Sequence, residues 1–146
     1  MLTIRETVDP TNTLPSVELK PIRIQEWEGL TREKLAIVAE GDEVGQCDIV
    51  LETNPHSQAA HFDGIEISEK KRGSGIGMAA YLLAIELAHS RGLPFETQDY
   101  DQTANSKRIW EVLAEKGVAQ VMEPFKPSQV REDRFVGKFR VPVPEV

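Results

Sequence analysis

The sequence predicts an α/β domain in which helices pack on a mixed sheet. Strand-like alternation of apolar and polar residues recurs between residues 17 and 67, and a long apolar helical segment follows at residues 75–91. A strand–helix–strand step in the middle of the chain favours parallel strands there. Tight turns elsewhere favour antiparallel pairs, so the expected sheet is mixed.

Length and composition bound the class of protein. The chain has 146 residues, of which 40% are hydrophobic and 28% charged, with a formal net charge of −7. We expect one domain over residues 1–146, with residues 1–16 as a loose N-terminal lead-in. The negative charge argues against non-specific nucleic-acid binding, which depends on summed cationic charge.

Cysteine and histidine usage excludes further chemistry. Cys47 is the one cysteine, and His56, His61 and His89 form no HExxH pattern, so neither a disulfide nor a paired-cysteine or HExxH metal site is expected. No run approaches the ~18 apolar residues of a membrane span, and the N-terminus lacks a signal-peptide pattern. We expect a cytoplasmic protein with no membrane partner.

The first strand is predicted over Val17–Ile24, where apolar and polar residues alternate. Pro21 cannot donate to a strand ladder, so this strand is expected at an edge or with an interruption. Residues 25–32 are polar around Trp27 and Leu30, with room for about two helical turns.

The next strands follow from turn signals. Lys34–Ala39 and Gln46–Leu51 flank a Gly-Asp turn and predict a β-hairpin. A second turn at Asn54–Ser57 leads to a strand over Ala60–Ile67. These runs supply the second, third and fourth strands.

A long helix is predicted over Gly75–Arg91. Its residues are good helix formers without proline, and Gly92 and Pro94 provide the stop. Because it is apolar nearly all round, we expect it to be buried against the sheet. The remaining segments predict a short strand at 93–98, a helix that opens near residues 103–106 and ends at Gly117, and strands at 118–125 and 134–143.

The segment between the fourth strand and the long helix carries the most chemistry. The cations Lys70, Lys71 and Arg72 precede glycines at 73, 75 and 77. Glycine permits a sharp turn with accessible N–H groups, and a helix N-terminus adds unpaired donors and a positive dipole end. This composition indicates an anion site, most often for phosphate; a tight turn beside solvated charges is the alternative.

Two common phosphate loops fit this segment poorly. A Walker A motif needs a lysine directly after its last glycine, and Ile76-Gly77-Met78 has none. Gly75, Gly77 and Ala80 match the dinucleotide pattern formally, with Glu96 further along. However, residues 68–72 separate the strand from the loop, and the remaining chain is short for a doubly wound sheet.

Arg72-Gly73-Ser74-Gly75-Ile76-Gly77 matches the pattern R/Q-x-x-G-x-G/A. It resembles the acetyl-CoA pyrophosphate loop of the GCN5-related N-acetyltransferases, the GNAT family. Ile65–Ile67 resembles the family's strand before that loop, and Trp110–Gly117 resembles the helix end before its sixth strand. The resemblance implies a GNAT-like acyltransferase fold of six to seven strands, with the long helix after the fourth.

The resemblance also implies acetyl-CoA as co-substrate, with no metal. The backbone of Glu66 and Ile67 would bond the pantetheine arm, and Asn105 would lie near the pantetheine or thioester, an N-cap role being its structural alternative. The pyrophosphate would be bound by the loop and the first helical turn, with the Ser74 hydroxyl as a further donor. This set is Arg72, Gly73, Ser74, Gly75, Ile76, Gly77 and Met78.

By the same resemblance the reaction is acetyl transfer to a primary amine, which must first lose a proton. Glu66 is the first candidate base, because it points to the opposite sheet face from its neighbours, and His61 is the second. Many family members use a tyrosine of the last helix as the acid. Here Trp110 is nearest to that position, and Tyr100 is the candidate substitute.

The acceptor is left open between a small-molecule amine and a peptide or protein. The family's specificity segment, here residues 25–33, is short and leaves the acceptor side open. Glu26, Glu28 and Glu33 would attract a cationic amine, a solvated acidic face being the alternative. A non-catalytic CoA-binding or partner-binding module and a small nucleotide-binding protein are competing functions. Dimers are frequent in the family, so a homodimer is also open.

Overall fold

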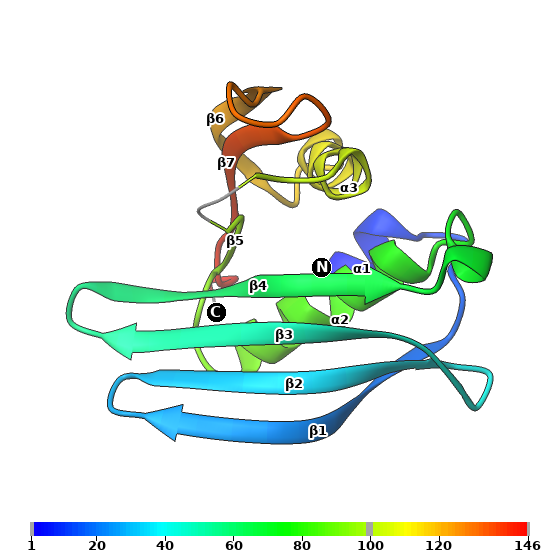
Figure 1. The fold of residues 1–146 in the computed structure, drawn as a ribbon, viewed down its shortest axis with the longest axis horizontal. Helices are drawn as coiled ribbons and strands as arrows, with labels where there is room; N and C mark the ends of the chain where they lie inside the picture. Colours follow the sequence, from blue (N-terminus) through cyan, green and yellow to red (C-terminus); the bar gives the residue numbers. More distant parts are fainter. Residues whose placement is uncertain (1, 99–100, 146) are drawn as a thin grey trace.

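The computed structural model describes residues 2–98 and 101–145. Within them, seven strands form one mixed sheet in the order β1-β2-β3-β4-β5-β7-β6 (Figure 1). The predicted α/β architecture is therefore confirmed, with the long helix after the fourth strand. The elements are α1 (Ile4–Val8), β1 (Val17–Trp27), β2 (Leu30–Ala39), β3 (Asp42–Asn54), β4 (Ser57–Ile67), η1 (Glu69–Lys71), α2 (Ile76–Ser90), β5 (Phe95–Glu96), α3 (Ala104–Glu115), β6 (Gln120–Pro127) and β7 (Phe135–Val141).

Strands β1 to β4 form an antiparallel meander, which confirms the predicted hairpin. β1 lies at the sheet edge and carries a register shift between Pro21 and Arg23, as the proline indicated. The helical turns expected at residues 25–32 are wrong. Trp27 pairs with Leu30 across a two-residue turn, because the alternation of β1 and β2 continues to the turn and extends the ladder.

The N-terminal lead-in is more ordered than expected, because residues 4–8 form helix α1. Thr3 and Glu6 build a capping box at its start, which satisfies two backbone N–H groups. The Asp9 carboxylate then accepts the N–H groups of Thr13 and Leu14 at 2.9 and 3.0 Å. These hydrogen bonds lower the pKa of Asp9 and fold the lead-in back toward α2.

The core lies between the sheet and α2, which lies behind β3 and β4 in Figure 1. Trp110 is 1% exposed and stacks on Phe95 with ring centroids 5.8 Å apart. Burial of side chains this large contributes about 1.5–3 kcal/mol each. Trp110 therefore serves the core rather than the position of a catalytic acid.

The sheet divides where its single parallel pair ends. β4 and β5 pair at Ala60 and Phe95, and β5 ends one residue later at Glu96. β4 continues to Ile67, so its second half has no β5 partner among the described residues. Figure 1 shows β4 and the α3–β7 part of the chain diverging from this point. None of the described helices has the length and hydropathy to span a bilayer.

Candidate functional site

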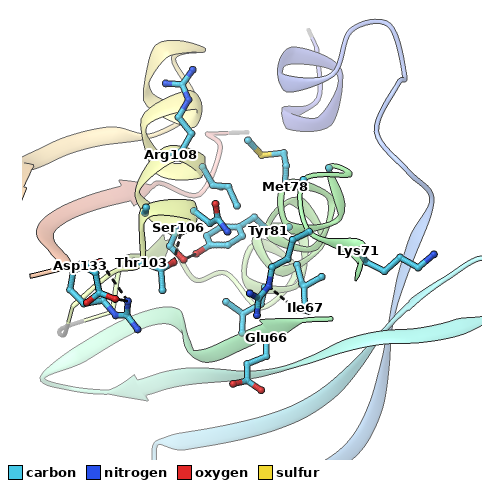
Figure 2. A pocket seen from close by; sticks show the side chains of 18 residues that line it. Glu66, Ile67, Lys71, Met78, Tyr81, Thr103, Ser106, Arg108 and Asp133 are labelled. Atoms are coloured by element: carbon cyan, nitrogen blue, oxygen red, sulfur yellow. Dashed lines mark hydrogen bonds and ion pairs between the residues drawn. The ribbon is translucent and has the colours of Figure 1, made fainter. Parts of the chain in front are cut away.

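A cleft of about 740 Å³ opens where β4 and β5 diverge. Its walls are the second half of β4, the glycine loop, the first turns of α2 and α3, and residues 133–134 before β7 (Figure 2). Because two strands that diverge leave backbone groups unpaired, this is the part of the sheet best able to bond a ligand.

The glycine loop enters α2 through left-handed backbone. Gly73 and Gly75 have φ values of +80° and +87°, and Gly75 is the N-cap, with no side-chain capping bond. The Ala79 N–H donates to the Gly75 carbonyl at 3.0 Å. The N–H groups of Ile76, Gly77 and Met78 therefore precede the helical ladder, at the positive end of the helix dipole.

Gly77 is constrained by close packing rather than by its backbone angle. A Cβ at this position would lie 3.3 Å from Ile109 Cδ1 and 3.5 Å from Ile67 Cδ1. One at Gly75 would lie 3.1 Å from both Leu14 and Pro15, so the lead-in supports the loop from outside the cleft. The loop glycines thus allow α2 to lie close to β4, to α3 and to the lead-in.

The loop is further fixed by two side chains. The Arg72 guanidinium donates from Nε to the Ile67 carbonyl at 3.1 Å, which ties the loop to the end of β4. The Ser74 hydroxyl donates to the Lys71 carbonyl at 2.5 Å. The Ser74 hydroxyl was expected to donate to a ligand, but its hydrogen bonds within the loop, because the tight turn brings the Lys71 carbonyl close to it.

The cleft is basic although the chain is acidic. Its charged lining comprises four basic and two acidic side chains: Lys71, Arg72, Arg108, Arg134, Glu66 and Asp133. Arg134 pairs with Asp133 at 2.9 Å, and Arg108 pairs with Glu115 at 3.3 Å and points along α3 (Figure 2). Lys71 and Arg72 have no such carboxylate partner among the ion pairs of the described residues, which favours an anionic ligand near the glycine loop.

Most of the predicted cofactor residues line this cleft. The seven that do are Ile67, Arg72, Gly73, Gly75, Gly77, Met78 and Asn105. Ser74 lies outside the lining, and Ile76 is 4% exposed and packs in the core. Asn105 is exposed at the second position of α3, whose N-cap is Thr103, so the capping alternative for Asn105 is wrong.

The predicted acid and base candidates have different positions. Glu66 is exposed at the cleft rim, and Figure 2 shows its side chain directed away from Tyr81 and the two helices. The Ser68 N–H donates to the carbonyl of Val44 in β3. Because the backbone groups of successive strand residues point to opposite sides, the N–H and carbonyl of Ile67 face away from β3, toward the cleft. His61 is outside the cleft lining, and Tyr100 lies outside the described residues.

Sequence reasoning missed a buried hydroxyl pair. The Tyr81 hydroxyl of α2 donates to the Ser106 hydroxyl of α3 at 3.0 Å, and Figure 2 shows the two side chains meeting at the cleft. Burial raises the pKa of Tyr81 to about 12. The available signal was the spacing, since Tyr81 follows Gly77 by four residues and shares its helix face.

Comparison with known proteins identifies the fold. No protein-family model and no curated protein sequence matches the chain. Nourseothricin acetyltransferase matches at a TM-score of 0.54 and 14% identity, over 95% of this chain and 92% of that one. The ribosomal-protein-S18-alanine N-acetyltransferase of Escherichia coli matches at 0.55 and 11%, over 83% and 74%. A GNAT-family acetyltransferase of Desulfovibrio desulfuricans matches at 0.56 and 14%, over 77% and 69%.

These likenesses establish the class of structure. The chain has the fold of the GNAT acetyltransferases, which confirms the resemblance seen in the glycine loop at the level of the fold. At sequence identities of 11–14%, these similarities establish the architecture alone. The chemistry of the site has to be argued from the residues of this chain.

Proposed function

We propose that this protein is an N-acetyltransferase that binds acetyl-CoA in the cleft between β4 and α3 and acetylates a primary amine. One observation supports it above the others. The uncapped N-terminus of α2 faces a cleft that contains Lys71 and Arg72, beside the end of β4 that has no β5 partner among the described residues. Backbone donors, a helix dipole and two cations together are suited to a pyrophosphate.

The residues of the cleft fit the cofactor. Its volume of about 740 Å³ lies within the range of ligand sites. Arg72, Gly73 and the N–H groups at the start of α2 would hold the phosphates. Ile67, whose backbone faces the cleft, and Asn105 would hold the extended amide arm. When bound, the thioester supplies an activated acyl carbon.

Two groups of this chain would handle protons. The Glu66 carboxylate, exposed at the rim and directed away from the two helices, is our candidate to receive a proton from an acceptor amine that approaches β4 from that side. The Tyr81 hydroxyl stays protonated at neutral pH, because its pKa is about 12. It donates to the Ser106 hydroxyl and so orients it, and the pair is our candidate to stabilise the departing sulfur through a hydrogen bond from Ser106, in place of the absent α3 tyrosine.

The acceptor side is open in this structure. The connection between β1 and β2 consists of residues 28 and 29, so no helix of that connection covers the sheet. An open approach suits a peptide or protein amine as well as a small molecule, and we propose either as acceptor class.

Two measurements test this function in sequence. CoA at ~100 times its dissociation constant should raise the free energy of unfolding by ~2.7 kcal/mol. Thiol release from acetyl-CoA over a panel of amines and peptides should then identify an acceptor. Cys47 is 2% exposed, and burial raises its pKa to about 12, so it gives little background with thiol reagents.

The outcomes separate the competing functions. Failure of CoA to stabilise the protein would contradict the cleft assignment. Stabilisation without thiol release from any acceptor would favour a CoA-binding module that retains the fold. Stabilisation by ATP or NAD that CoA does not compete with would favour a nucleotide-binding protein.

A further inference from the structure

A second, smaller groove lies along the C-terminal half of α2, apart from the cleft. It measures about 400 Å³ and lies between β1, β2 and one side of α2. Its apolar wall consists of Val17, Leu19, Pro21, Leu35, Leu83 and Leu87. It shares no lining residue with the cleft, so it is a separate candidate site.

One carboxylate is buried in this apolar wall. Glu33 shares the α2-facing side of β2 with Leu35, two positions along the strand. Its side chain is 6% exposed, and its Oε2 accepts no hydrogen bond from the described residues. Sequence reasoning grouped Glu33 with Glu26 and Glu28, but both of those are exposed.

The negative charge of Glu33 is only partly balanced by a cation of the chain. The closest cation is Arg91, with one guanidinium nitrogen 3.6 Å from Glu33 Oε2 and a side chain 49% exposed. That distance is outside hydrogen-bonding range, so the carboxylate keeps an unused acceptor at a buried position. A buried acceptor without a hydrogen-bond partner is destabilising, and in native structures such a group calls for an explanation, of which a bound cation is one.

We propose that this groove binds an aliphatic primary ammonium ion, with its –NH₃⁺ group on Glu33 and its hydrocarbon chain along the leucines. An ammonium would supply the missing charge-assisted hydrogen bonds. The apolar wall would bury the methylene groups of the chain, and removing them from water favours binding. Glu18 in the same lining adds negative charge, and the C-terminal end of α2 also favours a cation.

The proposal does not depend on acetyl transfer, because the groove lies away from the cleft. The ligand is a free aliphatic amine that binds as the cation and is not modified. The volume of about 400 Å³ is in the lower part of the range for small-molecule sites, which fits a short alkyl chain.

The test uses n-hexylammonium, with 1-hexanol as the uncharged analogue and hexanoate as the anionic one. Binding is measured by calorimetry to the wild-type protein, to Glu33→Gln and to Leu83→Trp. Glu33→Gln keeps the shape of the side chain and removes its charge. Leu83→Trp keeps the carboxylate and fills the groove from α2.

We expect the wild type to bind hexylammonium at least about tenfold more tightly than hexanol, and hexanoate not to bind. Glu33→Gln should lose this preference, and Leu83→Trp should lose binding of both ligands. The circular dichroism spectra of the three proteins should coincide, which shows that the fold is intact.

Three outcomes would overturn the proposal. The first is absence of saturable hexylammonium binding to the wild type, and the second is equal binding to wild type and Glu33→Gln. The third is a wild-type dimer in sedimentation that Leu83→Trp makes monomeric, because the groove would then be occupied by a second copy of the chain.

Discussion

The two ends of helix α2 differ in how the chain treats their backbone groups. At the N-terminal end the N-cap is Gly75, which makes no side-chain hydrogen bond to the helix. The first N–H groups of the helix therefore face the cleft beside the basic loop. At the C-terminal end the N–H of Gly92 donates to the His89 carbonyl and that of Leu93 to the Ala88 carbonyl. The N-terminal N–H groups are thus available to a ligand, whereas carbonyl groups at the C-terminal end are bonded by the following loop.

This difference shows that a helix dipole alone does not define a site. The dipole favours an anion at one end and a cation at the other by similar amounts. Only the N-terminal end also offers free backbone donors, so its ligand preference comes from the backbone together with the cations Lys71 and Arg72. At the other end the preference for a cation comes from a side chain, the buried Glu33.

The largest expected effect comes from exchanging a glycine for aspartate at each end of α2. Gly73 and Gly92 have φ values of +80° and +73°, and a Cβ at either position would meet nothing within 4 Å. Both substitutions therefore place an L-residue in the left-handed region and carry a similar strain, about 1 kcal/mol. Gly73→Asp adds a negative charge beside the proposed pyrophosphate site, so CoA binding measured by calorimetry should fall at least ~100-fold.

Gly92→Asp is the matched control for this substitution. It should lower the melting temperature by about as much as Gly73→Asp, roughly 2–4 °C, and bind CoA as the wild type does. Equal CoA affinity in the two variants would contradict the assignment of the loop.

A smaller effect is expected from removing one arginine at each end. Arg72→Gln removes the guanidinium that bonds the Ile67 carbonyl, so CoA affinity should fall about tenfold. Arg91→Gln removes the cation beside Glu33 and should leave CoA affinity unchanged. Calorimetric titration of both variants checks this, and a loss of CoA affinity in Arg91→Gln would show that the two ends are coupled.

The middle of α2 gives a prediction about alkaline pH. The pKa of Tyr81 is raised from 10 to about 12, so between these values the unfolded chain loses a proton that the folded chain keeps. Stability then falls with pH by about 1.4 kcal/mol per unit from this group. Denaturant unfolding at a series of pH values should show a smaller decline in Tyr81→Phe.

At neutral pH, Tyr81→Phe should cost about 1 kcal/mol, because Ser106 loses its donor. CoA affinity should stay unchanged while acetyl transfer slows. An unchanged alkaline decline would show that the hydroxyl is not held in its buried position.

The smallest expected effect is at acidic pH. Burial lowers the pKa of His89 below 6.5, so on acidification the unfolded chain binds a proton before the folded chain does. The contribution of His89 to the free energy of unfolding is therefore fully present above pH 6.5 and declines as the pH falls below that value. Melting temperatures between pH 7 and 5 should fall less in His89→Gln than in the matched exposed control His56→Gln.

Local patterns predicted most of the fold. Alternation and turn residues located the hairpins, and the apolar run with its stop at Gly92 located α2. The helical turns expected at residues 25–32 failed, because polarity alone does not distinguish a short helix from the exposed end of a hairpin. Helix α1 was missed although Thr3 and Glu6 carry a capping box, because the surrounding prolines favoured a loop.

The candidate site was predictable where the sequence is contiguous. Arg72–Met78 is one segment, and most of it lines the cleft. Tyr81 and Ser106 lie on different helices, so their hydrogen bond depends on tertiary packing. The burial of Glu33 likewise depends on α2 covering β2, which no local pattern of charge conveys.

An amide NMR titration with CoA tests the central claim most directly, since a chain of 146 residues suits the method. We predict that CoA shifts the resonances of residues 72–78 and Ile67, and leaves those of Glu33 and residues 87–92 in place. Shifts centred on the second set, or none at saturating CoA, would contradict the account.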